Sequence, residues 1–256
     1  MDKEEIVLKL IEYFKSEDPK YNSVKVPEDY EERRKLLRAF INIRPPMEIS
    51  EDILKLEDEL LNLELEEKGI VDVSSLAECE EHIVLWKGDI TRLKVDAIVN
   101  ACNSGMLGCF RPNHSCIDNQ IHTFAGIRLR LECNDIMKGE MLPTGDVRLT
   151  KGYNLPCNYV IETVGPIINR EVKPEDEEEL ASCYISSLKL AIQNGIKTIA
   201  FPCISTGVFS FPKKRACEVA VSTVRNYLNK NPGNIDKVIF NVYTDEDYEI
   251  YKEVLN

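Results

Sequence analysis

Two cysteines and a histidine lie close together in the middle of the chain, in the pattern C-x4-H-x-C. They are Cys109, His114 and Cys116, all within eight residues. Thiolate sulfur and imidazole nitrogen are ligands that zinc prefers, and a tetrahedral ion with three protein ligands and one open position is typical of catalytic zinc. The spacing differs from the paired cysteines of a structural zinc finger. We therefore expect a zinc site, with buried thiols and an ordinary histidine as the alternative.

A fourth protein ligand would close this site and make the zinc structural. Cys102, Asp118 and His122 are the candidates for that position. Asp118 and His122 are four residues apart, so they point the same way if a helix begins near residue 117. The two side chains then form either an acid–base or orienting pair beside the metal, or a purely structural contact between a carboxylate and a histidine.

The residues that carry this chemistry follow one of several short apolar segments. From residue 82 onward, we expect five buried strands: HIVLW, DAIVNA, YVIETV, KTIAFP and KVIFNVY. Helical stretches are expected near residues 118–138, 176–194 and 213–230. This alternation predicts an α/β fold with a mostly parallel sheet covered on both faces. Ligands bind at the carboxyl ends of the strands in such sheets.

Two further strand ends carry candidate binding residues. Residues 87–91 follow the first strand, and the carboxylate of Asp89 in this turn either accepts hydrogen bonds from an exocyclic amine or simply caps the turn. Residues 203–212, CISTGVFSFP, follow the fourth strand and precede a helix. Their small side chains allow main-chain N–H groups to approach a phosphate closely. The absence of GxxxxGK[ST] disfavours a P-loop nucleotidase.

The first 77 residues have a different character. Apolar residues recur on one face of three amphipathic helices, near residues 6–14, 36–41 and 53–63, and Ser50 is a candidate N-cap of the third. Residues 1–80 carry a net charge of -10, whereas residues 81–256 carry -2. We therefore expect a helical N-terminal extension, residues 1–77, that packs on an α/β domain formed by residues 78–256.

Composition excludes several classes of protein. The 256 residues are 43% hydrophobic and 30% charged, as in folded globular proteins. A net charge of -12 disfavours nucleic-acid binding. No apolar run reaches the roughly 18 residues of a membrane helix, and MDKEEIVLKLIEYFK is unlike a signal peptide, so no membrane partner and a cytoplasmic location are expected. Nine scattered cysteines disfavour a disulfide scaffold.

Several long segments together resemble the macrodomain family, whose members bind ADP-ribose. They are GDITRLKVDAIVNACNS, IDNQIHTFAG, TGDVRLTKGYNLPCNYVIETVGP and ISTGVFSFP, in the family's order within residues 82–256. Most macrodomains have a run of glycines where this chain has GCFRPNHSC. That departure resembles the zinc-dependent macrodomains of microbial pathogens. Those enzymes remove ADP-ribose from proteins, carry an N-terminal helical extension, and often accompany a sirtuin-type ADP-ribosyltransferase and lipoate-carrying proteins.

The resemblance implies a three-layer α/β/α macrodomain with a mixed, mostly parallel sheet and one zinc ion per chain, held by Cys109, His114 and Cys116. The implied ADP-ribose contacts are Asp89 (to the adenine amine), Ile90, Asn103 (to the distal ribose), Ser205, Thr206, Gly207, Val208 and Phe209. Asp118, Asn103 and His122 are the candidate catalytic residues. Tyr243, at the end of the last strand, either stacks on adenine or, as we expect, belongs to the core.

The expected activity is zinc-dependent hydrolysis of the bond between ADP-ribose and a protein side chain, with an ester to a carboxylate as the expected bond. The expected partner is an ADP-ribosylated protein, such as a lipoyl-carrier protein modified by a sirtuin-type transferase. A non-catalytic ADP-ribose reader with structural zinc and an O-acetyl-ADP-ribose deacetylase are the alternatives. We expect residues 78–256 to contain the whole ADP-ribose site and residues 1–75 to influence which modified protein is accepted.

Overall fold

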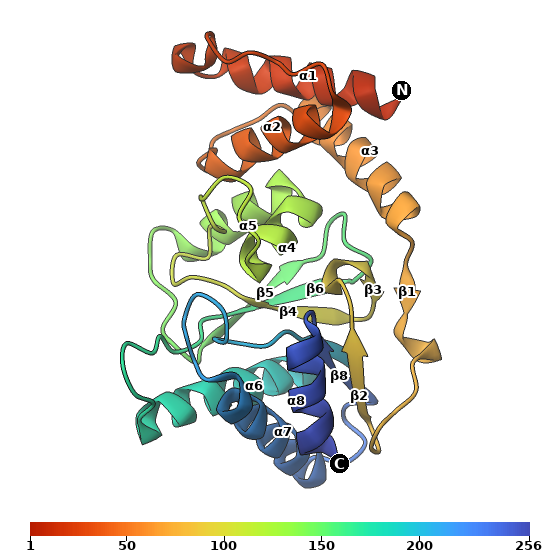
Figure 1. Ribbon diagram of the computed structural model, residues 1–256, viewed down its shortest axis with the longest axis vertical. Coiled ribbons are helices and arrows are strands. Elements are labelled where there is room, and N and C mark those ends of the chain that lie inside the picture. The colour runs from red at the N-terminus through yellow and green to blue at the C-terminus, as the bar shows by residue number, and fades with distance from the viewer.

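A helical N-terminal region precedes a three-layer α/β/α unit in the computed structural model, which describes residues 1–256 (Figure 1). The N-terminal elements are α1 (Lys3–Ser16), the short 3₁₀ helix η1 (Pro19–Tyr21), α2 (Tyr30–Ile43) and α3 (Glu51–Lys68). The carboxylates of Asp2 and Asp29 accept hydrogen bonds from main-chain N–H groups in the first turns of α1 and α2. Such bonds satisfy N–H groups that a helix leaves unpaired. Ser50 precedes α3 as expected, but its side chain makes no capping bond.

The three N-terminal helices enclose a hydrophobic core that also includes Ile127 of the α/β unit. The apolar face expected for α1 is buried, whereas α3 buries two faces instead of the single expected one. Leu54, Leu60 and Leu61 are buried, while Ile53 and Leu56 pack against this core from partly exposed positions. A second face is needed because α3 also contacts the α/β unit. The N-terminal region thereby packs on the rest of the chain.

Gly69 ends α3 with a φ of 75°, a conformation that residues with side chains rarely adopt. The chain continues into β1 (Val71–Asp72), which pairs in parallel with β3 (Leu93–Lys94). In the following 3₁₀ helix η2 (Val73–Ser75), Val73 is buried in the core of the α/β unit. Residues 71–75 therefore contact the α/β unit, although they precede the boundary expected after residue 77.

The main sheet has six strands in the order β2-β8-β7-β4-β6-β5. They are β2 (Ile83–Lys87), β4 (Ala97–Ala101), β5 (Val147–Lys151), β6 (Tyr159–Thr163), β7 (Thr198–Phe201) and β8 (Lys237–Val242). The five strands expected from sequence are mutually parallel, and β5 pairs antiparallel with β6 at one edge. The mixed, mostly parallel sheet is confirmed. Consequently, the carboxyl ends of the five parallel strands lie along a single edge.

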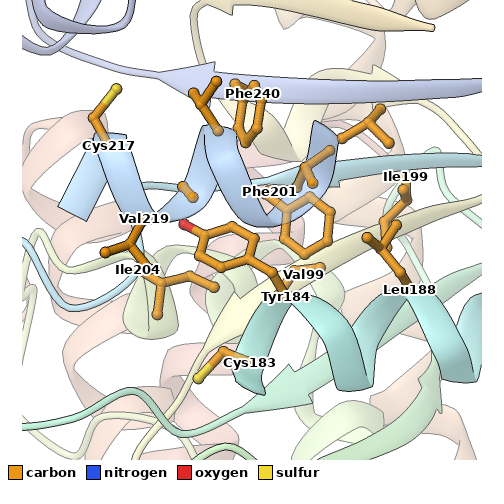
Figure 2. Packing of buried hydrophobic residues seen from close by; sticks show 14 of the residues in the cluster. Val99, Cys183, Tyr184, Leu188, Ile199, Phe201, Ile204, Cys217, Val219 and Phe240 are labelled. Atoms are coloured by element: carbon orange, nitrogen blue, oxygen red, sulfur yellow. The ribbon is translucent and has the colours of Figure 1, made fainter. Parts of the chain in front are cut away.

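Helices cover both faces of this sheet (Figure 1). One face carries α4 (Ile117–Ala125) and α5 (Ile127–Met137), and the other carries α6 (Pro174–Gln193), α7 (Lys213–Lys230) and α8 (Asp245–Leu255). Successive strand residues face opposite cores, so that Ile98 packs toward α4 and α5 while Val99 packs toward α6 and α7. In the larger core, Tyr184 of α6 packs against Phe201 of β7, with ring centroids 5.0 Å apart (Figure 2).

The helix expected over residues 118–138 is in fact two helices. Gly126, with a φ of 93°, ends α4 and precedes α5. A Cβ atom there would lie 3.0 Å from Oε2 of Glu57, so the glycine also allows α3 to approach closely. Neither β5 nor α8 was expected from the sequence. No helix in the structure combines the length and apolar character needed to cross a membrane.

Candidate functional site

The predicted binding segments follow neighbouring parallel strands and therefore lie in a row along one edge of the sheet. In sheet order, Asp89 follows β2, Tyr243 follows β8, residues 205–209 follow β7 and Asn103 follows β4. Adjacent strands are about 4.8 Å apart, so the row from β2 to β4 extends over about 14 Å. Open α/β sheets bind their ligands at this edge.

The three predicted zinc ligands come together in the loop between β4 and α4. The ligand atoms of Cys109, His114 and Cys116 all lie within 4.8 Å of one another, and each residue is partly exposed. Cys109 Sγ and His114 Nδ1 are 3.5 Å apart. Zinc–sulfur and zinc–nitrogen bonds of about 2.3 and 2.05 Å at a tetrahedral angle would separate these atoms by about 3.6 Å. The arrangement therefore fits a tetrahedral zinc ion.

Cys116 is also the N-cap of helix α4. Its Sγ accepts a hydrogen bond of 3.4 Å from the main-chain N–H of Asn119, and the positive end of a helix favours a thiolate. Burial nevertheless raises the pKa of the Cys116 thiol to about 12, and the neighbouring Cys109 adds to this effect. A divalent cation would supply the positive charge that two adjacent thiolates need. The chemistry of these donors therefore also fits a metal.

None of the three residues considered as a fourth ligand belongs to this group. Cys102 is buried, with its Sγ 3.3 Å from the carbonyl oxygen of Thr163. His122 belongs to a separate, fully buried cluster, and Asp118 is held by two asparagines. The group therefore consists of three protein ligands, which is the number that leaves one coordination position of zinc open.

Asp118 lies in the first turn of α4 and is buried. Its Oδ1 accepts a hydrogen bond of 2.9 Å from Asn100 Nδ2, and its Oδ2 accepts one of 3.2 Å from Asn103 Nδ2. Burial raises the pKa of Asp118 to about 6, against the opposing effect of the Asn100 amide. A carboxylate with a pKa close to neutrality suits proton transfer.

The loop after β7 presents unpaired main-chain donors. The N–H groups of Gly207, Val208 and Phe209 make no hydrogen bond within the chain. Ser205 has a φ of 65°, and its buried hydroxyl has no partner. A Cβ atom at Gly165, which follows β6, would lie 2.1 Å from the Ser205 oxygen, so the loop requires a glycine there. Consecutive free N–H groups of this kind bind anions such as phosphates.

Comparisons with known proteins agree with this arrangement. The model of the Macro domain family matches residues 99–220. A protein of Treponema medium named protein-ADP-ribose hydrolase is 46% identical over 253 residues, covering 96% of this chain and 97% of that protein. This chain belongs to the macrodomain family. The similarity to the Treponema protein also includes the N-terminal helices, since it covers nearly the whole chain.

Two further relatives support the assignment to the macrodomains. A protein-ADP-ribose hydrolase of Staphylococcus aureus strain Mu50 is 46% identical over 235 residues, covering 90% of this chain and 88% of that protein. The macrodomain of Trypanosoma brucei, solved in complex with ADP-ribose, superposes with a TM-score of 0.68 at 31% identity, covering 82% of this chain and 92% of that one. The three-layer fold is thus that of a macrodomain.

The structure gives the predicted residues after β2 and β8 of this macrodomain different surroundings. Asp89 caps the 3₁₀ helix η3 (Ile90–Arg92), since its Oδ1 accepts hydrogen bonds from the N–H and hydroxyl of Thr91 at 3.0 and 2.6 Å. Its Oδ2 makes no hydrogen bond within the chain. The side chain of Ile90 is buried, which leaves only its main chain for ligand contact. Tyr243 is 77% exposed, so the expectation that it belongs to the core was wrong.

The predicted pairing of Asp118 with His122 is only partly reproduced. Asp118 Oδ1 and His122 Nε2 are 3.6 Å apart, which is too long for a hydrogen bond, and both ring nitrogens lack partners. Burial lowers the pKa of His122 to about 3, with a smaller effect from the charge of Arg130, so the ring is neutral. The structure brings the two residues together, while a catalytic role for His122 stays a prediction.

Two residues beside Asp118 were missed. Asn100 Nδ2 donates both to Asp118 Oδ1 and, at 2.8 Å, to Glu162 Oε2. Burial and the charge of Asp118 raise the pKa of Glu162 to about 8. Both missed residues interrupt apolar strands, in DAIVNA and YVIETV, and a polar residue inside a buried strand is the signal that would have identified them.

Proposed function

We propose that this macrodomain protein is a zinc-dependent hydrolase that removes mono-ADP-ribose from protein side chains. The observation that carries the proposal is the three-ligand cluster Cys109–His114–Cys116 in the loop that follows Asn103. The row of predicted contacts, from Asp89 through the N–H groups of residues 207–209 to Asn103, has the same order as adenine, diphosphate and distal ribose. The metal cluster would then lie at the ribose that carries the protein.

The expected bond is an ester between the distal ribose and a side-chain carboxylate. Hydrolysis consumes one water and releases ADP-ribose and the free carboxylic acid. Positive charge grows on the ribose as its anomeric carbon loses the leaving carboxylate, which becomes anionic. Zinc held by the two cysteines and the histidine would supply a Lewis acid that orients the ribose hydroxyls and stabilises the developing negative charge.

Asp118 and Asn103 supply the remaining groups in this proposal. The Asp118 carboxylate orients the attacking water and accepts its proton, and its pKa of about 6 leaves it ionised at neutral pH. Asn103 borders the distal ribose, and its amide fixes one oxygen of Asp118. The unpaired N–H groups after β7 hold the diphosphate and so fix the ribose relative to the carboxylate.

The names of two relatives that are 46% identical support a hydrolase over a non-catalytic reader. A reader also has no need for a metal with an open coordination position. Deacetylation of O-acetyl-ADP-ribose would be a second ester hydrolysis in the same pocket. The choice of a lipoyl-carrier protein as the substrate rests on the resemblance described above and stays a prediction.

The proposal is tested by time courses of ADP-ribose release from a carboxylate-modified protein, with the acetyl ester measured in parallel. Release should stop after treatment with a zinc chelator and return when zinc is added back. Binding of ADP-ribose without release in zinc-loaded protein would favour the reader. Release at the same rate in metal-free protein would exclude a catalytic role for zinc. Hydrolysis of the acetyl ester alone would favour the deacetylase.

A further inference from the structure

Side chains of helix α2, in the N-terminal region, contact the loop that carries the candidate zinc ligands. Arg38 donates from Nη2 to the main-chain oxygen of His114 at 2.9 Å and to Oδ1 of Asn119 at 2.6 Å. One turn further along, Asn42 accepts through Oδ1 a hydrogen bond of 3.0 Å from the main-chain N–H of Asn113. In Figure 1, the N-terminal helices lie over α4 and α5, which places α2 beside this loop.

Helix α4 holds the same loop from its other side. Asn119 Nδ2 donates to the main-chain oxygens of Cys109 and Arg111, at 3.2 and 3.1 Å. Its Oδ1 accepts from Arg38 and from the hydroxyl of Thr123. Thr123 in turn accepts a hydrogen bond of 3.4 Å from Asn42 Nδ2. The side chains of the two helices therefore form one connected hydrogen-bonded group.

This group satisfies four main-chain polar groups between Cys109 and His114, a stretch without helix or strand. Two of those groups belong to the predicted zinc ligands themselves. Asn113 has a φ of 52°, in the left-handed region that asparagine tolerates better than most residues with a side chain. Asn42 and Asn119 are buried, and burying their amides is costly unless they are hydrogen-bonded. The bonds to the loop meet that requirement and fix the loop in return.

We propose that Arg38 and Asn42 are positioning residues for the zinc centre, so that the N-terminal region is part of this centre. The proposal rests on the zinc site proposed above. The sequence suggested a role for this region only in the choice of the modified protein, because contacts between residues 76 positions apart have no signature in the spacing of residues. Removal of either side chain would release the main chain of His114 or Asn113 and let the ligand atoms separate.

The test uses the full-length Arg38→Ala and Asn42→Ala variants, with Lys35→Ala as the matched control. Lys35 is also on α2, but it is exposed and pairs only with Glu32 of the same helix. Zinc affinity is measured with zinc alone, by competition with a chromophoric chelator. We expect affinity to fall about 10- to 100-fold in the first two variants, as for other residues that orient metal ligands. The control should retain the parental affinity.

Arg38→Lys provides a rescue test, because an ammonium keeps the charge but does not reproduce the geometry of the guanidinium. We expect an affinity between those of the parent and Arg38→Ala. The absorption bands of the cobalt(II)-substituted proteins should shift in the alanine variants, which reports ligand geometry independently of activity. In variants saturated with zinc, the affinity for ADP-ribose should stay within about threefold of the parent, since the diphosphate loop is untouched.

Folded Arg38→Ala and Asn42→Ala proteins that hold zinc as tightly as the parent would overturn the positioning role. Arg38 is partly exposed, so its variants keep the test valid if the buried Asn42→Ala does not fold. A parental protein that binds no zinc would overturn the zinc site itself, which distinguishes failure of the proposed function from failure of this inference. If Lys35→Ala lost as much zinc affinity as the Arg38 and Asn42 variants, the effect would come from altering α2 in general. That result would also contradict the proposal.

Discussion

Asn103 and Asp118 stand on either side of the metal-binding loop in the sequence and meet through a hydrogen bond of 3.2 Å from Nδ2 to Oδ2. This contact joins the end of β4 to the first turn of α4 and so closes the loop at its base. Asn100 binds the other oxygen of Asp118. Both oxygens of the carboxylate are therefore held by neutral amides, which fix its direction without neutralising its charge.

Replacement of Asp118 should separate catalysis from binding. We expect Asp118→Ala to lower kcat by about 100-fold or more, the usual effect of removing a positioned proton acceptor. The Kd for ADP-ribose should change little, because the diphosphate loop remains. Asp135→Asn is the matched control, since Asp135 is an exposed residue of α5. An Asp118→Ala protein that is folded, binds zinc and retains the parental kcat would exclude Asp118 from the chemistry.

The metal content of the protein should follow the three predicted ligands. We expect about one zinc per chain in tag-free protein, and almost none in Cys109→Ser and Cys116→Ser, since each loses one of three ligands. Cys79→Ser is the control, because Cys79 is an exposed free thiol outside the loop. Elemental analysis of protein never exposed to a chelator checks this. The assignment of the ligands would be contradicted if the parental protein contained no zinc, or if all variants contained the same amount of zinc per chain.

Sequence patterns predicted those features that depend on neighbours in the chain. Four of the five parallel strands are largely buried, and β2 at the edge of the sheet is partly buried, so all five read as mainly apolar runs. The predicted zinc ligands lie within eight residues of one another. The edge strand β5, VRLTK, is not a continuous apolar run, and its alternation of apolar and polar residues, typical of a half-buried strand, is the signal that would have identified it. The break at Gly126 was missed because apolar residues continue on both sides of it. The contact of Arg38 with His114 arises from tertiary packing alone.

A side chain at Gly207 should weaken ADP-ribose binding without unfolding the protein. A Cβ atom there would meet no atom within 4 Å, and the backbone is not in a conformation that requires glycine. In Gly207→Val, however, the added methyl groups crowd the three unpaired N–H groups of residues 207–209. We expect the Kd for ADP-ribose, measured by calorimetry, to rise at least tenfold, with Tm unchanged within a few degrees. If this variant bound ADP-ribose with the Kd of the parent, the loop would not be part of the diphosphate site.

Glu57, on the face of α3 that contacts α5, should make the stability of the protein depend on pH. Its Oε2 accepts a hydrogen bond of 2.9 Å from the main-chain N–H of Ile127, while its Oε1 is buried without a partner. Burial raises the pKa of Glu57 from 4.5 to about 7; the charge of Asp58 raises it further, and those of Arg34 and Arg130 oppose the shift. The folded protein therefore keeps a proton that the unfolded chain releases.

The sign of the effect follows from this difference in bound protons. Between about pH 4.5 and pH 7 the folded state binds more protons, so the free energy of unfolding falls as the pH rises, and the loss is complete above pH 7. At about 1.4 kcal/mol per pKa unit, the shift from 4.5 to about 7 limits the loss attributable to Glu57 to about 3 to 4 kcal/mol. Glu57→Gln stays neutral and keeps an acceptor for Ile127. Its stability relative to the parent should therefore increase across this range.

Urea unfolding at pH 5, 6, 7 and 8 measures that difference. Glu66→Gln is the control, because Glu66 is exposed on the same helix. Asp118 and Glu162 also have raised pKa values, but they are present in both proteins and cancel in the comparison. A difference between Glu57→Gln and the parent that is constant with pH would mean that Glu57 titrates alike in the folded and unfolded states. The packing of α3 against α5 would then not bury an uncompensated carboxyl group.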